Sequence, residues 1–322
     1  MRIIYNDCTD PYFNLASEEF LLEAGQGDIF MIWRNEKSVI IGKNQNAYGE
    51  INIDFCEKGG IKIVRRLTGG GAVFHDTGNV NFSFITDAPE ESGIDFLPYI
   101  KRVTDALAGF GIEAYPNGRN DIEAGGYKIS GNAQCRHNCA DGRVRLLHHG
   151  TLLFSADMAS LEGALNVKAD KIEAKGIQSV RSRVANIRDI DGYTGPEGAE
   201  DFARSLCKGA EGFAPEEIKA IEKLSLEKYS KWGWNFGKSP EFSKTLGKRF
   251  PFGEVEVSYS AKKGIIESIS IRGDFFSSED ISALENKLIG VSLEREELTD
   301  ALADVGRYVH GAACEDMISL FV

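Results

Sequence analysis

Residues 65–85 read Arg-Arg-Leu-Thr-Gly-Gly-Gly-Ala-Val-Phe-His-Asp-Thr-Gly-Asn-Val-Asn-Phe-Ser-Phe-Ile, which places a basic pair and three glycines between two strand-like runs. Glycine lacks a Cβ, so the glycines at 69–71 can approach a ligand oxygen closely and turn their N–H groups toward it. Consecutive strand residues point to opposite faces, so one of Arg65 and Arg66 can reach the ligand while the other stays structural. The stretch predicts an anion site; a glycine-rich hairpin with two solvated arginines is the alternative.

The two familiar phosphate-binding motifs do not fit this stretch. A P-loop requires Gly-x-x-x-x-Gly-Lys followed by Ser or Thr, and a dinucleotide fingerprint has its glycines between a strand and a helix. Here the glycines are followed by Ala72-Val73-Phe74-His75-Asp76 and then by the strand-like run 80–85. The glycine loop is therefore predicted to lie between strands.

A second group of motifs begins at residue 118. It comprises Gly-Arg-Asn-Asp at 118–121, Lys-Ile-Ser-Gly at 128–131 and His-His-Gly-Thr-Leu-Leu at 148–153. Gly-Gly at 125–126 and Asp-Gly at 141–142 are turn signals. These pieces are predicted to form successive antiparallel strands that lie side by side in one sheet.

Composition and charge indicate an ordinary globular enzyme. The chain has 322 residues, enough for two domains, and 42% hydrophobic residues. No segment is long and apolar enough for a membrane span, and the N-terminal Met-Arg-Ile-Ile-Tyr is not a signal peptide, so a cytoplasmic location without a membrane partner is expected. A net charge of −12 argues against nucleic acid as the main partner, because duplex binding depends on Lys and Arg contacts.

The motifs, taken in order, resemble the lipoate-protein ligases, which are related to biotin ligases and octanoyltransferases. The matching pieces are Arg65-Arg66-x-x-Gly-Gly-Gly-Ala-Val-Phe-His-Asp, 118–121, 128–131, 148–153 and Lys-Gly-Ile-Gln-Ser-Val-Arg-Ser-Arg-Val at 175–184. The resemblance implies activation of lipoate by ATP as lipoyl-AMP and then transfer to a lysine of a carrier domain. The implied carriers are the lipoyl domains of 2-oxoacid dehydrogenase complexes and the glycine cleavage H-type protein.

The resemblance also suggests which residues carry the chemistry. Lys128 matches the family's active-site lysine, and a cation is needed because the lipoate carboxylate and the α-phosphate repel each other by about 4 kcal/mol at an effective dielectric of about 20. Lys128 is therefore the predicted catalytic residue. Asp121 is the predicted Mg²⁺ ligand, since a hard cation takes carboxylate and phosphate oxygens. The alternative for Asp121 is a turn residue bonded to its own backbone.

Two overlapping sets of ligand-binding residues follow from the same resemblance. The predicted ATP site comprises Arg66, Gly71, Ala72, Val73, Phe74 and Lys128, and the predicted lipoate site comprises Arg66, Gly70, His75, Asn79, Lys128 and His149. Trp33 and Leu15 are candidates for an apolar slot around the dithiolane ring, or equally for the core. His75 and His149 also fit structural roles, and neither is identified as the base for the incoming lysine.

The cysteines bear on the rival functions. An octanoyl- or lipoyltransferase of this fold needs a cysteine nucleophile, and the segment just before Lys128 contains none. A non-catalytic lipoate-binding homologue is the other alternative. Cys135-Arg-His-Asn-Cys139 leaves open a zinc site at a hairpin tip, to which one of His148 and His149 could contribute.

The order of patterns predicts an α+β chain of two domains. The catalytic domain, 1–229, is expected to have a mainly antiparallel or mixed sheet of the biotin/lipoate ligase type, with helices over 14–23, 96–110 and 157–165 and from 197 and 215. Apolar runs at 29–33 and 38–42 are expected to form a buried hairpin. A linker rich in aromatic residues is predicted at 230–244, and a small α+β domain at 245–322.

Overall fold

The structure is a computed structural model that describes residues 1–88, 95–118, 120–165, 184–275 and 277–321. It divides into two compact units: Met1–Gln45 with Glu50–Lys231, and Asn46–Gly49 with Trp232–Val322. Among the described residues, no helix combines the length and the apolar character that crossing a bilayer requires.

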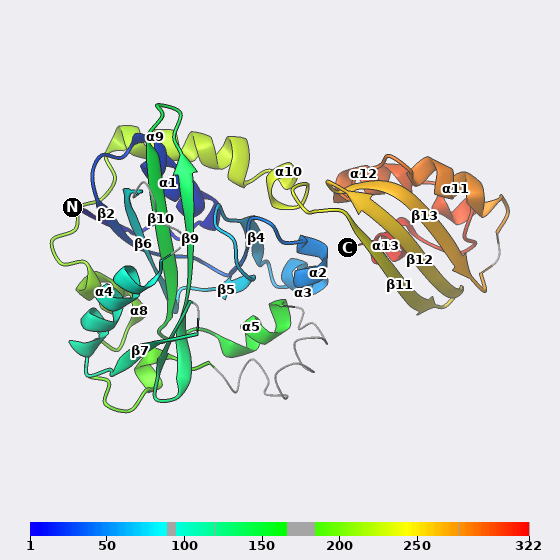
Figure 1. The fold of residues 1–322 in the computed structure, drawn as a ribbon. Coiled ribbons are helices and arrows are strands. Elements are labelled where there is room, and N and C mark those ends of the chain that lie inside the picture. Colours follow the sequence, from blue (N-terminus) through cyan, green and yellow to red (C-terminus); the bar gives the residue numbers. More distant parts are fainter. Residues whose placement is uncertain (89–94, 119, 166–183, 276, 322) are drawn as a thin grey trace. The chain divides into compact units, whose positions relative to one another are not determined.

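A seven-stranded sheet with the order β1-β2-β6-β10-β9-β8-β7 forms the centre of the first unit (Figure 1). Its strands are β1 (Arg2–Asn6), β2 (Ile29–Arg34), β6 (Asn79–Asp87), β7 (Ala114–Asn117), β8 (Asp121–Ala124), β9 (Tyr127–Asn138) and β10 (Val144–Leu153). β1 and β2 are parallel, and every other neighbouring pair is antiparallel. The predicted α+β class with a mainly antiparallel sheet is confirmed, as is the adjacency of the strands at 121–153.

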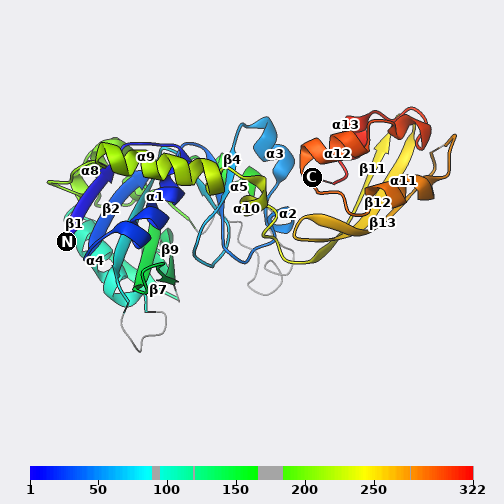
Figure 2. The same ribbon diagram turned by 90° about the horizontal axis from the view of Figure 1, so that it is seen from above.

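Helices cover both faces of this sheet. They include α1 (Pro11–Ala24), α4 (Leu97–Ala108), α8 (Ala199–Leu206) and α9 (Pro215–Leu224), which packs on α1. Helices α3 (Ile53–Lys58) and α5 (Met158–Ala164) instead contact the strands at 62–65 and 73–75. The unit also has a 3₁₀ turn at Ile187–Asp189 and a π-helical turn at Ser225–Tyr229. Strand β6 shows the two layers, because Phe82 and Phe84 pack into the core beside α4 and α8. Ser83, which points the other way, bonds to Glu18 of α1. Helices α1 and α9 lie side by side (Figure 2).

Helix α1 follows from its local sequence. The side chain of Asp10 accepts a hydrogen bond from Tyr12 N, and Pro11 occupies the first helical turn, where its missing N–H costs nothing. The helix ends at Gly25, whose N–H donates to Leu21 O. The helix predicted over 14–23 is thus present and begins three residues earlier.

A second, three-stranded sheet with the order β4-β3-β5 carries the glycine loop. Its strands are β3 (Ser38–Ile41), β4 (Lys62–Arg65) and β5 (Val73–His75). The loop joins β4 to β5, as predicted. The predicted hairpin of 29–33 with 38–42 is wrong, because β2 pairs with β1 and β6 whereas β3 pairs with β4 and β5. Both runs are apolar, so their pattern does not specify a partner.

The second unit is built on an antiparallel sheet of β11 (Phe242–Phe250), β12 (Gly253–Lys262) and β13 (Ile265–Gly273). Its helices are α10 (Trp232–Asn235), α11 (Ile281–Leu288), α12 (Arg295–Ala301) and α13 (Cys314–Ile318), with a 3₁₀ turn at Val305–Arg307. Helix α2 (Ala47–Glu50) brings a short piece of the first half into this unit, where Tyr48 stacks on Phe242. The predicted linker 230–244 contains α10 and the start of β11.

Candidate active site

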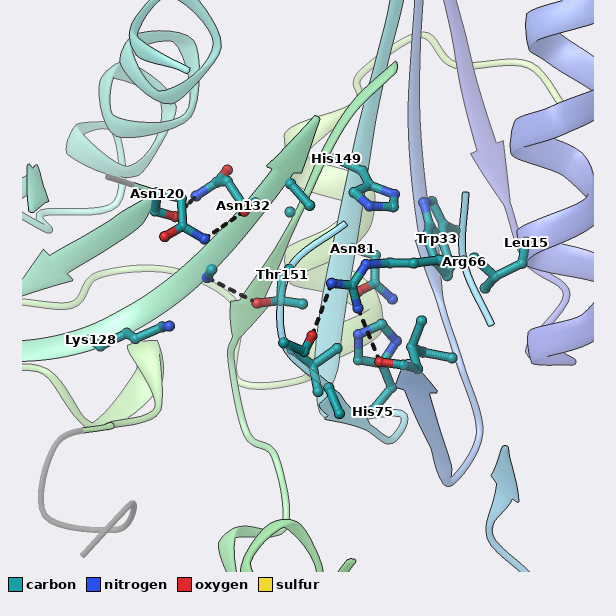
Figure 3. A pocket seen from close by; sticks show the side chains of 18 residues that line it. Leu15, Trp33, Arg66, His75, Asn81, Asn120, Lys128, Asn132, His149 and Thr151 are labelled. Atoms are coloured by element: carbon teal, nitrogen blue, oxygen red, sulfur yellow. Dashed lines mark hydrogen bonds between the residues drawn. The ribbon is translucent and has the colours of Figure 1, made fainter. Parts of the chain in front are cut away.

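A pocket of about 160 Å³, partly open to solvent, lies between the two sheets of the first unit. It is lined by Leu15, Trp33, Ile40, Arg66, Gly70, Gly71, Ala72, Val73, His75, Asn81, Asn120, Lys128, Gly131, Asn132, Ala133, His149, Gly150 and Thr151. Figure 3 shows Leu15 and Trp33 at one end and Lys128 at the other, so the pocket has an apolar end and a cationic end.

Arg66 holds the glycine loop together. Its Nε donates to Thr68 Oγ1 at 2.9 Å, its Nη1 to Ile40 O at 3.0 Å, and its Nη2 to Gly69 O at 2.6 Å and Gly71 O at 2.9 Å. A guanidinium has five N–H groups, and these four bonds use all but one of them. Burial lowers the pKa of Arg66 to about 10, so the side chain stays cationic at neutral pH. Arg66 therefore shapes the loop and brings positive charge to the pocket.

Arg65, the other member of the basic pair, points away from the pocket. Its Nη1 donates to the carbonyl oxygens of Gly42, Lys43 and Gln45, at 2.9, 3.1 and 2.8 Å. It thereby holds the turn that follows β3. The two arginines therefore lie on opposite sides of the chain, with Arg66 at the pocket and Arg65 away from it.

The loop needs glycine at position 70. Gly70 has a φ of 96°, and a Cβ there would lie 2.9 Å from Nη2 of Arg66. At Gly42, a Cβ would lie 2.1 Å from the carbonyl oxygen of Gly70. The chain therefore approaches itself more closely here than a side chain allows.

Gly70→Ala is expected to raise the KM values for ATP and lipoate, because the added methyl group presses on Arg66 and strains the left-handed backbone by about 1–2 kcal/mol. Gly69→Ala is the matched control, since a Cβ at Gly69 meets no atom within 4 Å and its φ is not in the left-handed region. Steady-state kinetics of the two variants check this. Equal kinetics for both would mean that the loop conformation does not matter for binding.

A buried network that the sequence did not reveal joins α1 to the glycine loop. Glu18 is 1% exposed and accepts hydrogen bonds from Ser83 Oγ at 2.6 Å and from His149 Nδ1 at 2.8 Å. His149 Nε2 lies 2.7 Å from Thr68 Oγ1, which also accepts from Arg66. With Nδ1 donating to the carboxylate, a neutral His149 accepts a hydrogen bond at Nε2 from the hydroxyl group of Thr68.

Position 18 carried one signal that could have been read from the sequence. Glu18 is an acidic residue that directly follows Asn14-Leu15-Ala16-Ser17, all of which is buried on α1. A carboxylate is almost never fully buried unless it is paired. Its charge offsets that of Arg66, because the two groups share one buried network.

His75 presents a hydrogen-bond donor to the pocket. Asn14 Nδ2 donates to Asn35 Oδ1 at 2.8 Å, so the Asn35 amide nitrogen faces His75 Nδ1, 3.0 Å away. His75 therefore accepts at Nδ1 and carries its proton on Nε2, which is buried without a partner among the described residues. Burial, with Arg66 and His149 nearby, lowers the pKa of His75 to about 3, so the ring is neutral.

Asn81 offers a second such donor. Its Oδ1 accepts from Asn79 Nδ2 at 2.8 Å, which turns its own Nδ2 away, and that nitrogen is buried with no partner within the described chain. A buried donor without a partner costs about 1–3 kcal/mol. Two of them at one pocket therefore favour a ligand with acceptor oxygens, such as a carboxylate or a phosphate.

The cationic end of the pocket is formed by β8 and β9. Lys128 Nζ lies 2.7 Å from Asp121 Oδ1, and each side chain is about one-third exposed. Beside this ion pair, Asn120 Nδ2 donates to Asn132 O at 2.8 Å, and Asn132 Nδ2 donates to Asn120 O at 3.0 Å. The predicted catalytic lysine and the predicted magnesium ligand are thus direct neighbours.

His148 supports this end of the pocket from the core. Asn132 Nδ2 donates to the carbonyl oxygen of Asn120, so it is Asn132 Oδ1 that lies 3.2 Å from His148 Nε2. His148 Nε2 therefore donates a hydrogen bond to Asn132 Oδ1. The ring stacks on Tyr99, and burial lowers the pKa of His148 to about 3. His148 and His149 therefore belong to different networks on opposite faces of β10.

Most of the predicted site residues meet at the pocket: Arg66, Gly70, Gly71, Ala72, Val73, His75, Lys128 and His149 line it, with Trp33 and Leu15. Phe74, Asn79 and Asp121 do not, although Asp121 pairs with Lys128, which does. Phe74 has its side chain buried beneath β5, and Asn79 contacts the pocket only through Asn81. Arg119 and residues 175–183 of the predicted motifs lie outside the described residues.

Comparison with known proteins finds relatives over nearly the whole chain. Residues 10–210 match the lipoyl protein ligase A/B catalytic domain, and residues 239–321 match the bacterial lipoate protein ligase C-terminus. Lipoate-protein ligase LplJ of Bacillus subtilis (strain 168) is 41% identical over 324 residues, which cover 97% of this chain and 96% of that protein.

Two solved structures are similar to the chain. One is the bi-partite lipoate protein ligase of Thermoplasma acidophilum, described with its E2 lipoyl domain, with a TM-score of 0.62, 28% identity and coverage of 74% of this chain and 96% of that one. The other is a lipoate-protein ligase A bound with ATP, with a TM-score of 0.61, 27% identity and coverage of 74% and 98%. On these grounds, the chain belongs to the lipoate-protein ligase family.

Proposed function

We propose that the pocket binds lipoate and ATP together, that it joins them as lipoyl-AMP, and that the lipoyl group then passes to a lysine of a carrier domain. One observation carries this proposal. The pocket has Leu15 and Trp33 at one end and Lys128 at the other, and between them the donors of His75 and Asn81, which have no partner in the described part of the chain. This order fits an acid with an apolar tail, whose carboxylate is directed toward a cation.

In the first step, a carboxylate oxygen of lipoate attacks the α-phosphorus of ATP, and the bond to the pyrophosphate oxygen breaks. Two anions must meet, so the charge of Lys128 lowers the cost of their approach. The same charge stabilises the phosphorane-like transition state as negative charge builds up on the phosphate oxygens. Lys128 extends from the start of β9, and its Nζ and Cε lie beside Gly131.

The nucleotide is proposed to lie along β5. In the order β4-β3-β5 this strand is an edge, so one row of its backbone groups is left for a ligand. Gly71, Ala72 and Val73 line the pocket, and Phe74 can contribute only its backbone because its side chain is buried. Backbone donors and acceptors at an edge match the hydrogen-bonding edge of adenine.

Asp121 is proposed to hold Mg²⁺. The ion, when bound, would neutralise phosphate charge. The carboxylate of Asp121 already faces Lys128 at 2.7 Å, so the two groups would share the phosphates between them. Asn120 offers a neutral oxygen next to them.

In the second step, the neutral amine of the carrier lysine attacks the acyl carbon, the bond to AMP breaks, and the amine releases a proton. Lys128 again stabilises the oxyanion that forms. Lipoyl domains are the carriers that fit the family, and the glycine cleavage H-type protein is proposed as a further carrier. We place the reaction in the cytoplasm, where these substrates would be met.

The test is ATP-dependent modification of a purified lipoyl domain, followed by intact-mass spectrometry. The expected result is addition of one lipoyl group in the presence of ATP, Mg²⁺ and lipoate, and none on a domain whose target lysine is changed to arginine. Modification without ATP, from an acyl thioester donor, would instead identify a transferase.

The cysteines disfavour that alternative. None of Cys8, Cys56, Cys135, Cys139, Cys207 and Cys314 lines the pocket, and all six lie in the described part of the chain. Burial raises the pKa of Cys135 to about 12, which leaves it protonated and unreactive.

Cys135→Ser is therefore expected to leave the rate of lipoylation essentially unchanged, because the activated intermediate is an adenylate. A single-turnover reaction quenched in acid and analysed by mass spectrometry should show no acyl-enzyme on any cysteine. A trapped thioester on Cys135, lost in the variant together with activity, would move the chain to the transferases.

A further inference from the structure

Three potential metal ligands meet outside the pocket, where the end of α1 meets the β9–β10 hairpin. Glu23 lies in the last turn of α1, His137 near the end of β9, and Cys139 at the start of the hairpin turn. Their ligand atoms all lie within 4.8 Å of one another. A carboxylate oxygen, an imidazole nitrogen and a sulfur form a set that suits zinc, whereas Mg²⁺ and Ca²⁺ prefer oxygen alone.

The strand geometry explains why these residues meet. His137 and Cys139 are two positions apart, so both side chains point to the face that α1 covers. The turn is closed by Cys139 N donating to Arg143 O at 2.8 Å and by Gly142 N donating to Cys139 O at 3.0 Å. The hairpin therefore presents two ligands from a fixed backbone.

The third ligand is already held beside them. His137 Nε2 lies 2.5 Å from Glu23 Oε1, and Ala140 N donates to Glu23 Oε2 at 3.0 Å. Cys139 is buried, with its Sγ 3.3 Å from Leu22 O. In the absence of an ion, each ligand thus has a hydrogen-bond partner within the cluster or at the helix end.

The charges near the cluster also suit a cation. Helix α1 has no basic residue in its last turn, and the carboxylate of Glu23 sits at the negative end of the helix dipole. Arg143 and Arg145 are the positive groups that act on Cys139. The Nη atoms of Arg143 bond the backbone carbonyls of Glu23 and Gly25, and its Nε pairs with Asp141. Arg145 pairs with Asp87 and donates to the carbonyl oxygen of Gly27. The carboxylate of Glu23 is left facing His137 and Cys139.

The distances are compatible with a tetrahedral ion. Zinc–ligand bonds of about 2.0–2.3 Å place the ligand atoms of a tetrahedron roughly 3.3–3.8 Å apart. The Glu23–His137 contact is 2.5 Å, and no two of the ligand atoms are more than 4.8 Å apart. Side-chain rotations would bring the three atoms to the spacing that an ion requires.

We propose that Glu23, His137 and Cys139 bind one zinc ion, with a water molecule as the fourth ligand. On binding, the thiol of Cys139 releases its proton to solvent, and neutral His137 moves its ring proton to Nδ1 so that Nε2 binds the metal. The ion then joins the end of α1 to the hairpin. Because α1 carries Leu15 of the pocket and Glu18 of the buried network behind it, the expected consequence is a more stable first unit.

This set differs from the one that the sequence suggested. Cys135 shares the face of β9 but is not part of the group of three, and both histidines of β10 are committed elsewhere, His148 to Asn132 and His149 to Glu18. Glu23 was not a candidate, because it is distant in sequence and only the packing of α1 brings it to the hairpin.

The test is metal binding by the full-length protein after treatment with a chelator. Titration with Zn²⁺ alone, in competition with a chromophoric chelator, should give one site, and Co²⁺ should give a thiolate-to-cobalt charge-transfer band. Cys139→Ser should abolish that band and weaken zinc binding at least about a hundredfold. Cys135→Ser, the matched control from the same face of the strand, should keep both.

Glu23→Gln separates a metal site from a simple ion pair. It preserves a hydrogen bond to His137 but removes a charged ligand, so zinc binding should weaken while the thermal stability without metal changes little. Zinc affinity that is the same in wild type, Cys139→Ser and Glu23→Gln would overturn the proposal. So would a cobalt band that depends on Cys135.

Discussion

Lys128→Ala is expected to lower lipoate-dependent ATP–pyrophosphate exchange by at least about a hundredfold, the usual effect of removing an electrostatic group at the reacting atoms. Lys128 and Arg66 are the two cations that line the described pocket, and most N–H groups of Arg66 are bound to the protein. Without Lys128, the carboxylate and the phosphate would meet beside an uncompensated Asp121.

The matched control for this variant is Lys101→Ala. Lys101 pairs with Asp105 at 2.9 Å on the exposed surface of α4. The control variant therefore also removes a lysine–aspartate pair, but one far from the pocket. Both variants should unfold close to the wild-type temperature, since exposed pairs contribute about 0–1 kcal/mol. If a folded Lys128→Ala protein exchanged as fast as Lys101→Ala, Lys128 would not be the catalytic lysine.

Glu18→Ala is expected to lower the free energy of unfolding by about 3–5 kcal/mol, the usual cost of leaving a buried charge uncompensated. The change leaves His149 Nδ1 and the hydroxyl of Ser83 without their shared acceptor, and it removes the charge that offsets Arg66. Activity should fall too, because His149 and Thr68 shape the pocket beside the glycine loop. Urea denaturation and the exchange assay measure the two effects.

Two further variants test the cause. Glu18→Gln keeps an acceptor oxygen for Ser83 and His149 and should destabilise the protein much less. Glu36→Ala, which breaks a surface pair with Lys62 at 2.7 Å, should cost about 1 kcal/mol or less. A Glu18→Ala protein as stable as Glu36→Ala would show that the buried network does not support the fold.

The local patterns predicted the fold where they specified both an element and its partner. Gly-Gly at 125–126 and Asp-Gly at 141–142 mark tight turns, and the strands on either side of each turn do pair. The runs at 29–33 and 38–42 lack such a turn, and their apolar residues fit any buried strand. Their separation into two sheets depends on β1, β4 and β6, which are distant in sequence.

The same limit applies to the second unit. Asn46–Gly49 belongs to it because Tyr48 packs on Phe236 and Phe242, almost two hundred residues away. No local pattern predicts a contact over that separation. The alternation of strands and helices after residue 250, by contrast, was visible because each element carries its own periodicity.

In the candidate site, the motifs located the residues that a ligand could touch, and the network that holds them came only from the structure. Lys128, His75 and His149 lie in recognisable motifs. Glu18 and Asn81 stand among other polar residues of a helix and a strand, and their importance depends on being buried. The loop around Arg66 also determines how many of its N–H groups remain for a ligand, and the sequence does not show this.

The central claim is that this pocket forms an acyl-adenylate without help from a carrier protein. The most direct measurement is exchange of labelled pyrophosphate into ATP by the purified full-length protein, with Mg²⁺ and with or without lipoate. Exchange that requires lipoate, and that proceeds without any carrier domain, is the predicted result. A protein that binds lipoate but shows no lipoate-dependent exchange would contradict the claim and favour a binding protein without catalytic activity.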